Sequence, residues 1–87
     1  MSQKVFSETG WEDYLYWQTQ DRKTLNRINR LLQSIERDGV LDGEGQPEKL
    51  KYKAGMYSRR IDGKNRLVYK IDGDRVIVES CRGHYED

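Results

Sequence analysis

Residues 56–82 read MYSRRIDGKNRLVYKIDGDRVIVESCR and contain the clearest strand pattern of this chain. The β-branched and aromatic residues of this stretch fall into three runs, at 56–61, 66–71 and 76–82. DGKN at 62–65 and DGD at 72–74 separate these runs, and an Asp-Gly pair between apolar runs is a strong hairpin signal. The stretch therefore predicts an antiparallel meander of three strands. We expect a further strand at 50–52 and a short edge strand at 4–6.

The residues upstream of the meander have helical periodicity. TGWE at residues 9–12 matches the capping box that opens a helix, and we expect that helix to continue to about Thr19 with Trp11 and Leu15 in the core. Asp21 is placed to cap a second helix, which the pair Asp38-Gly39 ends. The apolar stripe of this second helix consists of Leu25, Ile28, Leu31, Leu32 and Ile35.

The order of the elements defines the fold class. Helices followed by strands predict an α+β fold, with two N-terminal helices packed on one face of an antiparallel β-sheet. The segment 40–48 is rich in Gly, Asp and Glu and contains the only proline, so it predicts a loop inside one domain. A chain of 87 residues has room for a single small core, and we expect one domain over 1–87.

Composition narrows the class of protein. The single Cys81 allows no intrachain disulfide and no metal site built from paired cysteines, and we expect neither a metal nor a cofactor. The chain has no run of about 20 apolar residues that would span a membrane, and its first ten residues do not resemble a signal peptide. The expected location is the cytoplasm, with no membrane partner.

Positive charge is concentrated in the middle of the chain. The net charge of the whole protein is +1, but residues 49–70 carry eight basic side chains and one acidic side chain, a net of +7. Such a segment predicts a polyanionic partner, although the solvated face of a sheet would have the same composition. Three tyrosines among the cations are suited to stacking on bases, or alternatively belong to the core: Tyr52, Tyr57 and Tyr69.

Four residues have the chemistry required to cleave RNA through its own 2′-hydroxyl. The reaction needs a base, a cation near the phosphate and an acid for the leaving 5′-oxygen. Glu48 is the candidate base, Arg66 the candidate phosphate ligand and His84, the only histidine, the candidate acid, with Tyr85 in support. The simpler alternatives are a solvated loop carboxylate for Glu48, a surface histidine, and for Arg66 an ion pair with Asp62 or Glu79.

Five spaced blocks carry a resemblance to a known family. They read WEDYLYW at 11–17, GQPEKLK at 45–51, YSRRI at 57–61, NRLVY at 65–69 and CRGHY at 81–85. In this order they resemble the YoeB/Txe toxin family. The resemblance implies the RelE-like microbial ribonuclease fold and a toxin that cleaves mRNA in the ribosomal A site while a partner antitoxin holds it inactive.

The resemblance also implies roles for individual residues. Glu48 matches the general base of the family, Arg66 its transition-state arginine, His84 its general acid and Tyr85 the adjacent functional tyrosine. Family members often end at the position of Tyr85, whereas this chain continues with two acidic residues. The residues expected to bind RNA or the ribosome are Lys49, Lys51, Lys53, Arg59 and Arg60.

The expected partners are mRNA, ribosomal RNA and an antitoxin with a disordered acidic C-terminal segment that covers the cationic face. We also expect a homodimer, with Tyr16 and Trp17 offering apolar surface. Two alternatives stay open. One is a non-catalytic RNA-binding module, and the other is a toxin of the same fold that acts on a protein target such as gyrase, whose ParE-like members lack the set Glu48, Arg66 and His84-Tyr85.

Overall fold

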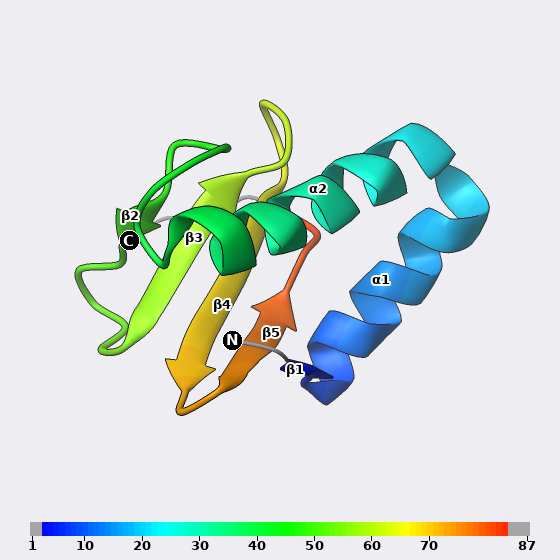
Figure 1. Ribbon diagram of the computed structural model, residues 1–87. Helices are drawn as coiled ribbons and strands as arrows, with labels where there is room; N and C mark the ends of the chain where they lie inside the picture. Colours follow the sequence, from blue (N-terminus) through cyan, green and yellow to red (C-terminus); the bar gives the residue numbers. More distant parts are fainter. Residues whose placement is uncertain (1–2, 84–87) are drawn as a thin grey trace.

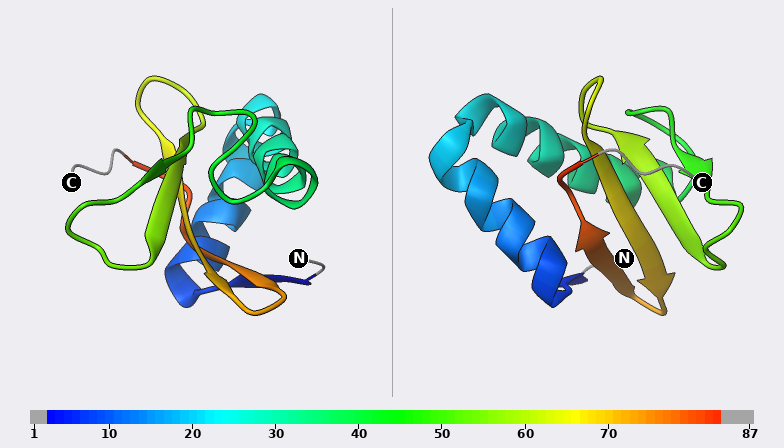
Figure 2. Two further views of the ribbon diagram at one scale, coloured as in Figure 1. Left: turned by 60° about the vertical axis from the view of Figure 1, so that its left-hand side comes forward. Right: turned by 180° about the vertical axis from the view of Figure 1, so that it is seen from behind.

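Two helices cover one face of a five-stranded sheet in the computed structural model, which describes residues 3–83 (Figure 1). The elements in chain order are β1 (Gln3–Phe6), α1 (Glu8–Gln20), α2 (Arg22–Asp38), β2 (Glu48–Lys49), β3 (Met56–Arg60), β4 (Arg66–Asp72) and β5 (Arg75–Ser80). The predicted α+β class is confirmed. Figure 2 shows both helices on one side of the sheet and the loop after β2 on the other.

The sheet is mixed, not antiparallel throughout as predicted. Its strand order is β1-β5-β4-β3-β2, and every neighbouring pair is antiparallel except β1 and β5, which run parallel. Parallel strands need a long crossover connection, and here the helices and the other strands lie between them in sequence. The edge strand β2 is Glu48–Lys49, so the predicted strand at 50–52 is displaced by two residues.

Side chains at the helix ends set where α1 and α2 begin. Ser7, not Thr9, caps α1, because the Ser7 hydroxyl accepts a hydrogen bond from the Gly10 amide at 3.0 Å. Asp21 caps α2 as predicted by accepting from the amides of Lys23 and Thr24. Within residues 3–83, neither helix is long and apolar enough to cross a membrane.

The core lies between α2 and the central strands. The predicted apolar stripe of α2 is buried, and it packs against the helix-facing side chains of β4 and β5: Leu67, Tyr69, Val76 and Val78. Fully burying one large aliphatic side chain stabilises a fold by about 1.5–3 kcal/mol. The paired stripes of α2 and the sheet are therefore the main source of stability.

Helix α1 contacts the rest of the protein through a narrower face than predicted. Trp11 is 48% exposed and Leu15 is 41% exposed, so the prediction that both belong to the core is wrong. Gly10 is buried instead, because its missing side chain lets α1 approach the Val78 carbonyl closely. Trp17 is partly buried against the core, and Tyr16 lies under the Arg82 guanidinium. These two side chains are therefore engaged within the chain.

Candidate active site on the open face of the sheet

Strand register places two of the predicted catalytic residues on the face of the sheet away from the helices, here called the open face, where the loop after β2 lies and where Ser58 and Val68 are buried. Glu48 lies opposite Ser58, and Ser58 lies opposite Val68. Residues opposite one another in antiparallel strands share a face, and so do residues two apart in one strand. Arg66 is two residues from Val68, so Glu48 and Arg66 lie on the same face. By the usual strand spacing and rise, their Cα atoms are roughly 12 Å apart.

Glu48 is an exposed residue whose backbone is fixed on both sides. Before it, the Gly45 carbonyl accepts a hydrogen bond from the Arg60 amide at 2.6 Å. After it, the Leu50 amide donates to the Met56 carbonyl at 3.0 Å, and the Leu50 side chain is buried. β2 is therefore a short, anchored edge strand that presents a carboxylate to solvent.

Arg66 is partly buried at the start of β4, close to a second cation. Its guanidinium Nη1 donates to the Asp62 carbonyl at 2.9 Å and to the Asn65 carbonyl at 3.2 Å. Arg60 lies directly opposite Arg66 in the β3–β4 ladder. Like charges directly opposite one another destabilise a sheet. This pair creates a local positive field on the open face, and an anion bound there would relieve the repulsion.

His84 and Tyr85 lie outside the described residues, which end at Gly83. Gly83 itself is attached to the site. Its carbonyl accepts a hydrogen bond from the Arg66 amide at 3.0 Å, and its amide donates to Asn65 Oδ1 at 2.8 Å. The residue before His84 is therefore tied to the backbone of Arg66.

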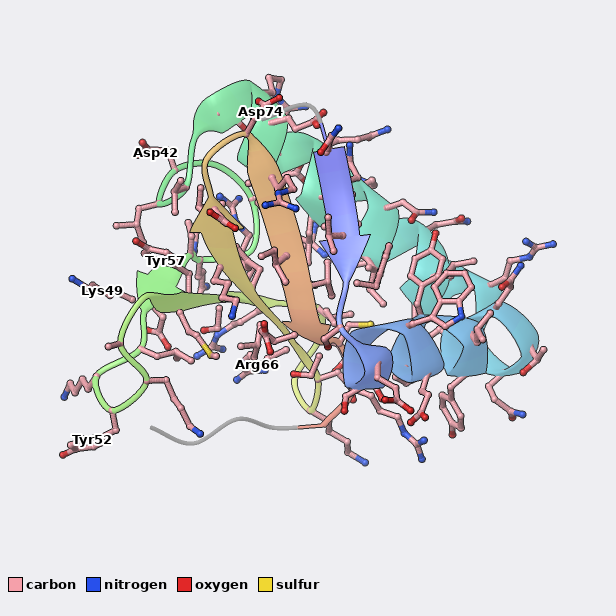
Figure 3. The ribbon with its side chains drawn as sticks, turned by 90° about the horizontal axis from the view of Figure 1, so that it is seen from below. Asp42, Lys49, Tyr52, Tyr57, Arg66 and Asp74 are labelled. Carbon is pink, nitrogen blue, oxygen red and sulfur yellow. The ribbon has the colours of Figure 1, made fainter. Side chains whose placement is uncertain are left out.

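Four of the five predicted RNA-binding cations are exposed: Lys49, Lys51, Lys53 and Arg60. Lys51 and Lys53 belong to the loop after β2, and Figure 3 shows Lys49 and Tyr52 projecting outward from β2 and this loop. Tyr52 is 80% exposed, whereas Tyr69 is buried in the core and stacks on Tyr57. Of the three tyrosines, Tyr52 is the one placed to stack on a base.

Arg59 is the fifth predicted RNA-binding cation, and its position corrects that prediction. It lies opposite Leu67 on the helix side of the sheet and is 0% exposed. Its guanidinium donates hydrogen bonds to Tyr69 Oη at 2.9 Å, Ser34 Oγ at 3.0 Å and the carbonyls of Glu44 at 2.9 Å, Gly39 at 2.7 Å, Val40 at 3.3 Å and Asp42 at 2.8 Å. Arg59 is a structural residue that fastens the loop between α2 and β2.

Asp62 and Asn65 form a small hydrogen-bond network in the β3–β4 turn, and no pattern in the sequence marks this network as part of a site. Asp62 Oδ1 accepts from the amides of Lys64 and Asn65, each at 2.7 Å. Asn65 Nδ2 donates to Asp62 Oδ1 at 3.2 Å and Oδ2 at 3.1 Å. Burial raises the pKa of the Asp62 carboxyl, but these hydrogen bonds outweigh it and hold the pKa below its ordinary value.

The two acidic residues considered as ion-pair partners of Arg66, Asp62 and Glu79, have other partners as well. The Glu79 carboxylate pairs with Lys70 at 3.3 Å. The carboxylate of Asp62 accepts hydrogen bonds from the turn, while Arg66 donates to the Asp62 carbonyl. Among residues 3–83 there is no group of three or more His, Cys, Asp or Glu side chains that would hold a metal ion.

Solved structures that resemble this chain include bacterial toxins. The chain is similar to the YoeB dimer of Staphylococcus aureus, with a TM-score of 0.90 and 46% identity over 95% of this chain and 97% of that one. It is also similar to a chain of the heterotetrameric YoeB–YefM toxin–antitoxin complex of S. aureus, with a TM-score of 0.88 and 48% identity over 94% and 95% of the two chains. The fold and these relatives thus place the chain in the class of small α+β toxins.

The family follows from the sequence. The model of the YoeB-like toxin of bacterial type II toxin–antitoxin systems matches residues 6–85. Toxin YoeB of Escherichia coli K12 is 42% identical over 82 residues, which cover 93% of this chain and 96% of that toxin. This chain belongs to the YoeB-like family of type II toxins.

Proposed function

We propose that this toxin is a ribosome-dependent endoribonuclease that cleaves mRNA in the ribosomal A site and so inhibits translation. One observation carries the proposal. Glu48 and Arg66 share the open sheet face, and the chain leading to the only histidine is hydrogen-bonded to the Arg66 amide. A candidate base and a candidate phosphate ligand thus share one side of a basic sheet, and Gly83, the residue before the candidate acid, is hydrogen-bonded to the backbone of that phosphate ligand.

The proposed reaction is an internal transesterification. Glu48 accepts the proton of the 2′-hydroxyl, and the 2′-oxygen attacks the adjacent phosphorus. The bond from phosphorus to the 5′-oxygen of the next nucleotide then breaks, and His84 as imidazolium gives its proton to that oxygen. The products are a 2′,3′-cyclic phosphate and a free 5′-hydroxyl, and Tyr85 assists in placing the scissile phosphate.

Arg66 stabilises the charge that develops on the phosphate oxygens in the transition state. Positioned cationic donors contribute most when they face the developing charge directly. The position of Arg60 opposite Arg66 adds a second cation to the same end of the face. Lys49, Lys51 and Lys53 extend this positive surface along the RNA, so binding should weaken steeply with salt.

The ribosome supplies the orientation that the exposed site lacks. Glu48 is a solvent-exposed residue on a two-residue edge strand, and the open face has no helix above it. Free RNA would meet this face in many orientations, whereas mRNA held in the A site presents one phosphate in one geometry. Action on ribosomes places this toxin in the cytoplasm.

The partners proposed for this chain follow from its relatives and its charge. The S. aureus structures are a YoeB dimer and a YoeB–YefM complex. We extend both assemblies to this protein, as a homodimer and as a complex with an antitoxin. An acidic C-terminal segment of the antitoxin would neutralise the cationic face, fold on binding and exclude RNA.

A single-turnover cleavage assay on programmed 70S ribosomes tests the function. Wild type should cut the A-site codon and leave a 2′,3′-cyclic phosphate, and Glu48→Gln or His84→Ala should slow cleavage roughly a hundredfold or more. Glu12→Gln is the matched control, because Glu12 is an exposed carboxylate on α1. Ribosome binding without cleavage by wild type would indicate the non-catalytic module, and inhibition of gyrase without either effect would indicate a protein target.

A further inference from the structure

The last described residues, Cys81, Arg82 and Gly83, are held by side chains from two distant parts of the chain. The Cys81 amide donates to Asp13 Oδ2 at 3.0 Å, and Trp17 Nε1 donates to the Cys81 carbonyl at 2.8 Å. The Arg82 guanidinium carbon lies 3.6 Å from the centre of the Tyr16 ring. One face of α1 therefore fixes the start of this segment.

The end of the segment is fixed by the β3–β4 turn. Gly83 accepts from the Arg66 amide at 3.0 Å and donates to Asn65 Oδ1 at 2.8 Å. Gly83 has a φ of 95°, a backbone conformation open to glycine and few other residues. Because glycine moves freely among many conformations, these two hydrogen bonds select the direction in which the chain leaves Gly83.

The contact with Asp62 fixes the orientation of the Asn65 side-chain amide. Asp62 accepts from Asn65 Nδ2 through both carboxylate oxygens, at 3.2 and 3.1 Å. A carboxylate accepts hydrogen bonds and an amide nitrogen donates them, so this contact fixes the nitrogen toward Asp62. The amide oxygen is thereby directed toward the Gly83 amide. Asp62 orients Asn65, and Asn65 orients Gly83.

We propose that Asn65 is a positioning residue that, oriented by Asp62, fixes the backbone of Gly83 beside Arg66 and so sets the direction in which the chain leaves Gly83 toward the general acid His84. The inference rests on the proposed function, because His84 needs accurate placement only if it donates a proton. Asn65 does not touch the reacting atoms in this scheme. Its removal should lower the rate of the chemical step and leave RNA and ribosome binding nearly unchanged.

Two variants separate positioning from general stability. Asn65→Ala removes the acceptor for the Gly83 amide. The double substitution Asp62→Asn with Asn65→Asp exchanges the two side chains, so that a carboxylate still accepts from Gly83 and from the new amide at 62. The exchange keeps the net charge, an acceptor for the backbone amides of residues 64, 65 and 83, and one hydrogen bond between the two side chains in place of two. Asn26→Asp, at an exposed site on α2, controls for adding a carboxylate.

The experiment measures two quantities on the full chain. The first is the exchange rate of the Gly83 amide in ¹⁵N-labelled protein, and the second is the single-turnover rate and half-saturating ribosome concentration over a range of pH. Asn65→Ala should raise the exchange rate about tenfold and lower the cleavage rate tenfold or more, with less than a threefold change in half-saturation. The exchanged pair should recover both rates to within about threefold.

Three outcomes would overturn the inference. In the first, Asn65→Ala leaves the hydrogen-exchange rate of the Gly83 amide unchanged. In the second, Asn65→Ala raises that rate but cleaves RNA as fast as wild type. In the third, the variant with the two side chains swapped cleaves RNA as slowly as Asn65→Ala. If wild type itself does not cleave RNA, the proposed function fails. Gly83 exchange then still reports separately whether Asn65 holds the segment.

Discussion

Arg59 and Arg60 are consecutive residues of β3 whose side chains lie on opposite faces of the sheet. Arg59 is 0% exposed and donates its hydrogen bonds to α2, Tyr69 and the loop that follows α2, whereas Arg60 is exposed opposite Arg66. Side chains alternate between faces along a strand, so two neighbouring arginines have unrelated roles. One supports the fold, and the other contributes to the surface proposed for RNA.

Replacing Arg59 should destabilise the protein strongly. Arg59→Met removes the donors for the carbonyls of Gly39, Asp42 and Glu44 and leaves them without these partners. We expect a loss of about 3–5 kcal/mol in the free energy of unfolding, because buried polar groups would lose their charged partner. Urea denaturation measures the loss. A variant within 1 kcal/mol of wild type would show that the loop holds its conformation without the guanidinium.

Replacing Arg60 should change RNA binding and not the fold. We expect Arg60→Gln to stay within about 0.5 kcal/mol of wild type in urea denaturation, because its side chain is exposed. On single-stranded RNA, the slope of log affinity against log salt should become shallower by about 0.7, the value for one phosphate contact. Fluorescence anisotropy over a salt series measures that slope. An unchanged slope would place Arg60 away from the RNA.

The contrast between Arg59 and Arg60 shows what the sequence could and could not predict. Strand periodicity and the Asp-Gly turns predicted β3, β4 and β5 to within a few residues, and the apolar stripe and the Asp21 cap predicted α2. Both signals are local. The face that each strand residue occupies depends on register, which one shifted residue reverses, so the burial of Arg59 could not be read from the sequence.

Contacts between residues that are far apart in the sequence could not be predicted from it either. β1 pairs in parallel with β5, and Asn65 binds Gly83, although neither pair is close in sequence. The helix α1 was predicted correctly, but its buried face was not. Trp11 and Leu15 have helical spacing, whereas the face that packs on β5 includes Gly10, whose lack of a side chain carries no apolar signal. Packing at a glycine is invisible to a hydrophobic pattern.

The Cys81 thiol should be inert in the folded protein. Burial, together with the nearby Asp13 carboxylate, raises its pKa to about 12. At pH 8 only about one thiol in ten thousand would then be the reactive thiolate. Ellman's reagent should react slowly with native protein and rapidly in urea. Ala54→Cys, which adds a thiol in the exposed loop after β2, should give one fast equivalent per chain under native conditions. Fast native reaction of wild type would mean that Cys81 is accessible.

Acid should remove a stabilising contribution from Asp38. Hydrogen bonds from Arg37 and then Ser34 hold the pKa of this carboxyl below its ordinary value of 3.8. A depressed folded-state pKa gives stability that is present above the unfolded pKa and is lost as the pH falls through the folded value. Wild type should therefore be more stable than Asp38→Asn at pH 7, and the difference should shrink below pH 4. Urea denaturation at both pH values tests this, and a difference that stays constant with pH would contradict it.

Two glycines with the same backbone requirement should respond differently to alanine. Gly45 has a φ of 88° and Gly55 a φ of 77°, so alanine is strained at both positions. A Cβ at Gly45 would also lie 2.7 Å from Leu31 Cδ2 and 3.0 Å from Arg59 Cβ, whereas one at Gly55 would meet nothing within 4 Å. Gly55→Ala should destabilise by about 1 kcal/mol from backbone strain alone. Gly45→Ala should cost about 3 kcal/mol or more once overpacking is added.

The same pair tests how β2 presents Glu48. Gly45 lies three residues before Glu48, and its carbonyl accepts a hydrogen bond from the Arg60 amide. A shift of the backbone at Gly45 therefore passes directly into β2. At a temperature where both variants are folded, Gly45→Ala should cleave mRNA on ribosomes at least tenfold more slowly than Gly55→Ala, because a displacement of about 1 Å of a reacting group lowers rates by up to a hundredfold. Equal cleavage rates in the two variants would show that Glu48 does not depend on the packing beneath Gly45.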